Sequence, residues 1–99
     1  MQVPDALVDL QLSVYQERSA LGEFVRSSGP GKDWSTGVLE EAARRQRSLE
    51  ESERVLECGV RDQARTEDQV RELRRVLRRQ ALISLATQDA RQPRGRARA

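Results

Sequence analysis

The chain has 99 residues, of which 36% are hydrophobic and 34% are charged. This length allows one small domain and excludes a second core. Leu, Ile, Val and Phe together number 22, which is little to bury, so we expect the chain to complete its core with a partner. The sequence has no histidine and a single cysteine, and these counts disfavour most catalytic and metal-site chemistry. We therefore predict a protein that is not an enzyme and that uses no cofactor and no metal.

Cysteine usage also bears on the compartment. The lone Cys58 cannot form a disulfide within the chain, whereas small extracellular domains commonly depend on disulfides. Residues 1–5 contain no basic residue, so they do not resemble a signal peptide. The sequence has no run of about 18 apolar residues, which a membrane-spanning helix would need. We expect an intracellular protein of the cytoplasm or nucleus that is not secreted and has no transmembrane segment.

The net charge of +2 conceals an asymmetry along the chain. Residues 1–69 carry a formal charge of −5, and residues 70–99 carry +7. The chain is therefore a mildly acidic body followed by a basic C-terminal third.

The first predicted helix covers residues 4–27. Pro4 is favourable in the first turn of a helix, and Asp5 lies near the positive end of the helix dipole. Apolar residues recur at helical spacing over a face that is wider than a two-stranded coiled coil needs, so we expect this helix to have at least two neighbours. Residues 28–33 form the predicted turn, in which Gly29 can adopt the left-handed conformation that ends a helix.

The next helix is predicted to begin near residue 35, with Asp33 or Ser35 as its N-cap. Trp34 is the only tryptophan and comes directly before this cap. We interpret Trp34 as a hydrophobic staple that packs on the first turns of the helix. The alternative is an anchor for a partner, because tryptophan is enriched at such positions.

Residues 35–90 contain no proline and follow one heptad register whose central positions are polar. Two interpretations fit this pattern. One is a single long or kinked helix of roughly 50 residues, and the other is a pair of helices that break near Gly59 or before Thr66. Residues 66–69 have the pattern of a capping box, but a lone glycine only weakens a helix. We predict the long or kinked helix, over residues 35–90.

These elements predict an all-α fold, either a helical hairpin or a three-helix arrangement with coiled-coil character. Residues 1–90 would form a single helical domain. Residues 91–99 have no apolar anchor and intersperse arginine with proline and glycine, so we predict a disordered basic tail.

The apolar heptad positions are the candidate surface for a partner protein or a second copy of the chain. The same positions could also pack the chain's own helices together, and the two uses do not exclude each other. In a hairpin, residues 70–85 would project with apolar side chains such as Leu73 and Leu77 uncovered. The residues predicted to bind a partner are Leu7, Leu10, Val14, Leu21, Phe24, Leu49, Leu56, Val70, Leu73, Leu77 and Ile83.

Five arginines within residues 71–79 form a basic face opposite this apolar stripe. Such a face can bind nucleic-acid phosphates, an anionic membrane surface or an acidic partner helix, although it is more commonly a solvated face beside a coiled-coil seam. An acidic run that includes Glu57 could face these arginines if the chain folds back. The possible anion or nucleic-acid contacts are Arg71, Arg74, Arg75, Arg78 and Arg79, with Arg91, Arg94, Arg96 and Arg98 of the tail.

The sequence therefore predicts a non-catalytic interaction subunit or adaptor of an intracellular complex, which assembles through apolar helix faces. The alternative is a nucleic-acid-associated protein that uses the basic C-terminal third. Attachment to an anionic membrane surface is disfavoured.

Overall fold

A computed structural model describes residues 3–91 of the chain, and its side chains as far as residue 88. Three α-helices make up most of this range: α1 (Asp5–Ser27), α2 (Thr36–Gln63) and α3 (Glu67–Arg91). A short 3-10 turn, η1 (Gly31–Asp33), lies between α1 and α2, and residues 3–91 contain no strand. The all-α fold with a three-helix arrangement is confirmed.

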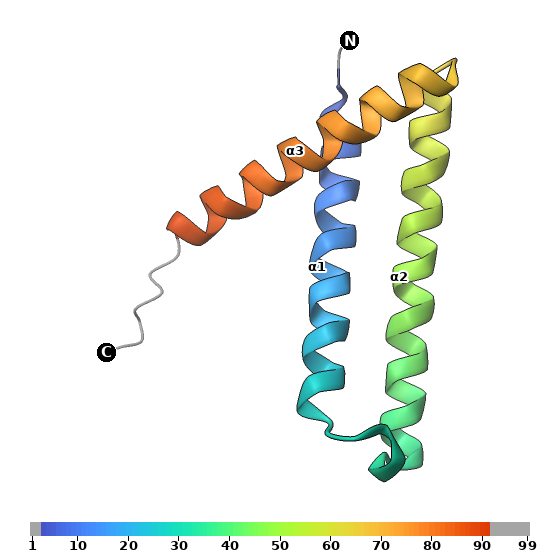
Figure 1. The fold of residues 1–99 in the computed structure, drawn as a ribbon, viewed down its shortest axis with the longest axis vertical. Coiled ribbons are helices and arrows are strands. Elements are labelled where there is room, and N and C mark those ends of the chain that lie inside the picture. Colours follow the sequence, from blue (N-terminus) through green and yellow to red (C-terminus); the bar gives the residue numbers. More distant parts are fainter. Residues whose placement is uncertain (1–2, 92–99) are drawn as a thin grey trace.

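The helices α1 and α2 form an antiparallel hairpin, and α3 crosses the end of the hairpin where α1 begins and α2 ends (Figure 1). The crossing helix packs mainly on α1. Its C-terminal half then continues past α1 and projects from the hairpin (Figure 1). The molecule measures only 17 Å along its shortest axis. Since a helix with its side chains is roughly 10–12 Å wide, few side chains have protein on every side.

The turn between α1 and α2 forms through local polar contacts. Gly29 has a φ of +79°, the left-handed conformation that ends a helix without steric cost. The Trp34 indole Nε1–H donates a hydrogen bond to the Gly29 carbonyl oxygen at 2.9 Å, which closes the loop. Ser35 Oγ accepts a hydrogen bond from the Val38 N–H at 3.2 Å, so Ser35 and not Asp33 is the N-cap of α2.

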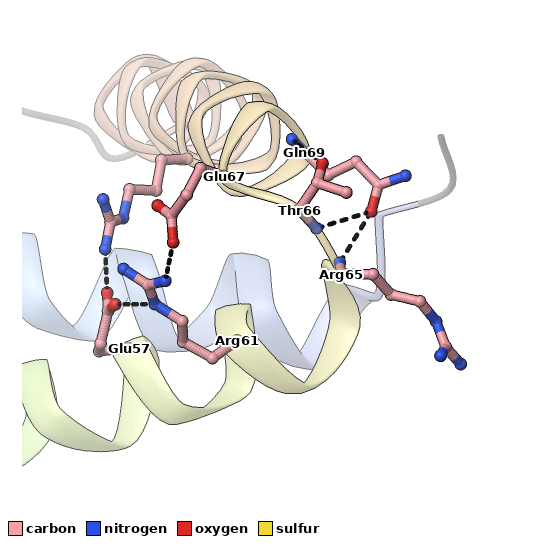
Figure 2. Close-up of polar contacts among 7 residues, drawn as sticks. Glu57, Arg61, Arg65, Thr66, Glu67 and Gln69 are labelled. Carbon is pink, nitrogen blue, oxygen red and sulfur yellow. Dashed lines mark hydrogen bonds and ion pairs between the residues drawn. The ribbon is translucent and has the colours of Figure 1, made fainter.

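The predicted long or kinked helix is wrong, because the chain leaves the helical conformation at Ala64 (φ −107°, ψ 137°). Thr66 Oγ1 accepts a hydrogen bond from the Gln69 N–H at 3.1 Å, and Gln69 Oε1 accepts one from the Thr66 N–H at 3.3 Å (Figure 2). The Arg65 N–H also donates to Gln69 Oε1, at 2.7 Å. This reciprocal capping box replaces the backbone hydrogen bonds that a continuous helix would have made. The break therefore lies before Thr66, as the alternative interpretation had it, and Gly59 stays inside α2.

The main core lies where the three helices meet. It consists of Leu7 from α1, Val60 from α2, Ala64 at the α2–α3 connection, and Val70, Leu73 and Leu77 from α3. Further along the hairpin, Val14 and Leu49 are also buried. Nearer the turn, where α3 does not reach (Figure 1), Leu21 and Phe24 remain partly exposed. The third helix thus completes the burial of one end of the hairpin only.

Candidate interaction surface on the third helix

The first half of α3 uses one face to dock on the hairpin. Val70, Leu73 and Leu77 recur at helical spacing and have exposed fractions of 2%, 0% and 0%, and Ala81 at the end of the row is also fully buried. Burial of such aliphatic side chains stabilises the docked helix by roughly 1.5–3 kcal/mol each. The expectation that Leu73 and Leu77 would be uncovered is therefore wrong, because the first half of α3 crosses α1 and buries both side chains there.

Beyond Ala81, α3 also carries apolar side chains on the face opposite the docked row. Successive residues of a helix are about 100° apart, which places Leu82, Ile83 and Ala86 opposite the row that docks on α1. Leu82 is 56% exposed and Ile83 is 53% exposed. On the inner face, the row continues with Ser84 and Leu85, which are both half-buried. Exposed apolar side chains thus lie on the outer face of α3, in the half of the helix that projects past α1 (Figure 1).

A sequence signal for this surface is the charge pattern. Residues 80–88 (QALISLATQ) contain no charged residue and form the longest uncharged run in a chain that is 34% charged. The sequence predicts Ile83 as a partner-binding residue and does not predict Leu82, although neither residue falls on the heptad register. The uncharged run would have indicated both.

Three of the five arginines on the basic face of α3 are held by acidic residues of the same chain. The ion pairs are Arg71–Asp68, Arg75–Glu72 and Arg74–Glu57. Arg78 and Arg79 form no ion pair with any side chain among residues 3–88. They precede Leu82 and Ile83 by four residues, so each lies one turn before an exposed apolar side chain on the same side of the helix.

Glu57 joins α2 to α3 through arginines from both helices. Its Oε2 accepts a hydrogen bond from Arg61 Nε at 2.7 Å (Figure 2), and its Oε1 accepts one from Arg74. Arg61 Nη1 also donates to Glu67 Oε2 at 2.7 Å, across the break between the helices (Figure 2). The hydrogen bonds from Arg61 and then Arg74 lower the pKa of Glu57, against a smaller effect of desolvation. The acidic run thus faces the arginine cluster at this one position.

A polar cavity of about 360 Å³ lies at the junction of the three helices. Its wall includes the ion pair between Arg18 and Glu53, at 2.8 Å, and the pair between Arg74 and Glu57. Most of its charged groups therefore satisfy each other. In the part of the chain that the structure describes, no cluster of His, Cys, Asp or Glu could hold a metal ion.

The residues predicted to bind a partner fall into three classes of exposure. Buried in the chain's own core are Leu7, Val14, Leu49, Val70, Leu73 and Leu77. Partly buried are Leu10, Leu21, Phe24 and Leu56. Ile83 is the exposed member of the set. Of the tail arginines, Arg94, Arg96 and Arg98 and the side chain of Arg91 lie outside the described residues.

No protein-family model, curated protein or solved structure matches the chain. None of the helices within residues 3–91 is both long enough and apolar enough to span a membrane.

Proposed function

We propose that the protein is a non-catalytic interaction subunit that binds another protein through the outer face of the projecting half of α3. The observation that carries this proposal is the exposure of Leu82 and Ile83 at 56% and 53%, on a helix segment that leaves the hairpin. An apolar ridge on a helix is a common contact for a groove or a second helix. Because about half of each of these side chains is already covered, burial of the remainder contributes roughly 1 kcal/mol each to association.

The lone cysteine supports an intracellular location for this interaction, in the cytoplasm or the nucleus, since reducing compartments do not require disulfides. The nucleic-acid alternative has less support. Three of the five arginines within residues 71–79 already pair with carboxylates, and those carboxylates would repel phosphates.

The experiment compares the full chain with two double variants in quantitative co-purification from cells. Leu82→Asp with Ile83→Asp alters the outer face of α3. Leu39→Asp with Val55→Asp is the matched control, because these α2 residues have similar exposed fractions of 52% and 43%. We expect the α3 variant to lose the proteins that the unmodified chain retains, and the α2 variant to keep them.

Equal retention by both variants would contradict the proposal. The nucleic-acid alternative predicts a different result: binding that weakens steeply as the salt concentration rises and does not depend on Leu82 or Ile83.

A further inference from the structure

The chemistry of the partner is indicated by the residues around Leu82 and Ile83, an argument that rests on the proposed function. We propose that this surface binds an amphipathic helix that carries acidic residues beside its apolar face. In this arrangement the apolar face covers Leu82 and Ile83, and the partner's carboxylates meet Arg78 and Arg79.

The arginines beside the exposed apolar residues indicate the charge of the partner. Arg71, Arg74 and Arg75 each form an ion pair with a carboxylate of the same chain. Arg78 and Arg79 form no ion pair with a side chain of residues 3–88, although Arg78 lines the cavity that Glu53 and Glu57 also line. Each lies one turn before an exposed apolar residue. A partner that covers Leu82 and Ile83 therefore also brings two guanidinium groups into its interface. Such groups are favourable in an interface when carboxylates pair with them.

The shape of the surface favours a helix as the binding element. Arg78 with Leu82, and Arg79 with Ile83, form two rows of residues four apart along α3. Rows at this spacing are the ridges that fit between the side chains of a second helix. The exposed apolar part is short, and it lacks the continuous apolar face of a helix that lies in a lipid interface. A protein helix therefore fits this surface better than a membrane does.

A second copy of the chain is a poor occupant. Residues 78–91 contain three arginines and one acidic residue, so two copies of this segment would bring together a net charge of +4. Like charges at an interface oppose association.

The experiment uses the full chain and two constrained helical peptides as probes. Both peptides carry the same leucine face, and one has glutamates beside that face where the other has lysines. Binding is measured by fluorescence anisotropy at low and moderate salt. We expect the glutamate peptide to bind about tenfold more tightly than the lysine peptide. The double variant Arg78→Glu with Arg79→Glu should reverse this preference.

The matched control is Arg44→Glu with Arg47→Glu, which changes two exposed arginines of α2 and should leave the preference unchanged. Leu82→Ser with Ile83→Ser should abolish binding of both peptides. If the serine variant abolishes binding but the charge reversal has no effect, the acidic partner is wrong and the proposed function stands. If the serine variant binds both peptides like the unmodified chain, the proposed function is wrong as well.

Two further outcomes would overturn the proposal in favour of another occupant. One is binding to vesicles of phosphatidylcholine with phosphatidylserine, lost in the serine variant, with no binding to either peptide. The other is self-association of the full chain, measured by light scattering, that the serine variant abolishes.

Discussion

Gly59 of α2 lies directly against Leu7 of α1. A Cβ atom on Gly59 would be 2.5 Å from Leu7 Cδ2, a distance that real Cβ contacts do not show. Leu7 is itself buried in the core, so it has little room to move. From the sequence, Gly59 was a weak point in the helix or the site of a break. In the structure it permits the close approach of α1 and α2 beside the point where α3 crosses.

The first prediction concerns this contact. Gly59→Ala gains about 1 kcal/mol of helix propensity, but displacement of Leu7 costs about 1–3 kcal/mol, so we expect a net loss of stability. In a Leu7→Val background, which removes both Cδ atoms, the same substitution should stabilise the protein by about 1 kcal/mol. Urea unfolding followed by circular dichroism measures both values. Stabilisation of equal size in the two backgrounds would show that the helices are not in close contact here.

The second prediction separates the two faces of α3. Leu77→Ala removes a fully buried side chain and should reduce the free energy of unfolding by about 2–5 kcal/mol. Leu82→Ala removes a side chain that is 56% exposed and should change it by less than about 0.5 kcal/mol. The difference between the variants in urea midpoint is the measurement. Similar losses for both would place Leu82 in the core and remove the candidate surface.

The third prediction concerns the capping box between α2 and α3. Thr66→Ala should lower the free energy of unfolding by about 1 kcal/mol, because the Gln69 N–H loses its acceptor, whereas Thr66→Ser keeps the hydroxyl and should change little. Thr87→Ala is the control in the same helix. The Thr87 hydroxyl donates to the Ile83 carbonyl oxygen at 2.9 Å, and this carbonyl lies in the interior of α3, so the hydroxyl does not cap a helix end. A loss for Thr87→Ala as large as that for Thr66→Ala would argue against a specific cap.

The fourth prediction is a pH dependence. The pKa of Glu57 is lowered by its hydrogen bonds from Arg61 and Arg74, so the folded state favours the ionised form. The resulting stability is present above the ordinary glutamate pKa of about 4.5 and is lost as the pH falls through the lower folded pKa. Because Glu57 is partly exposed, its contribution is about 0.5–1 kcal/mol.

Glu57→Gln should therefore lower the free energy of unfolding at pH 7, and its difference from the unmodified protein should shrink below about pH 4.5. Glu40→Gln, which changes an exposed residue with no ion pair to another side chain of residues 3–88, is the control. A difference for Glu57→Gln that stays constant from pH 7 down to the acid limit would contradict the role of these hydrogen bonds.

The sequence predicted the hairpin and its caps because local residues decide them. Gly29, Ser35 and Pro4 act within one or two turns of their own positions. The choice between one long helix and two could not be made from periodicity. Val60, Val70 and Leu73 all face the same core, so apolar residues on both sides of the break are buried together and their spacing does not mark where the first helix ends. The reciprocal bonds of Thr66 and Gln69 cap the N-terminus of α3. The sequence contained this capping-box pattern but did not show that it would be preferred over a continuous helix.

The candidate surface was only partly predictable for a different reason. Whether Leu77 or Leu82 faces solvent depends on where α3 crosses α1, and that crossing is a tertiary arrangement. The heptad register selected Leu77 as the exposed residue and overlooked Leu82. In the structure Leu77 is buried and Leu82 is exposed, because the heptad positions of α3 lie on the face that docks on the hairpin.

The hydrogen bond between Trp34 and Gly29 has a practical consequence for spectroscopy. The only tryptophan of the chain sits at the turn, at the opposite end of the hairpin from the crossing of α3 (Figure 1). Its fluorescence therefore reports whether the α1–α2 loop is closed, and it should not change when α3 detaches from the hairpin. Titrations and unfolding experiments on the outer face of α3 need a probe placed on that helix.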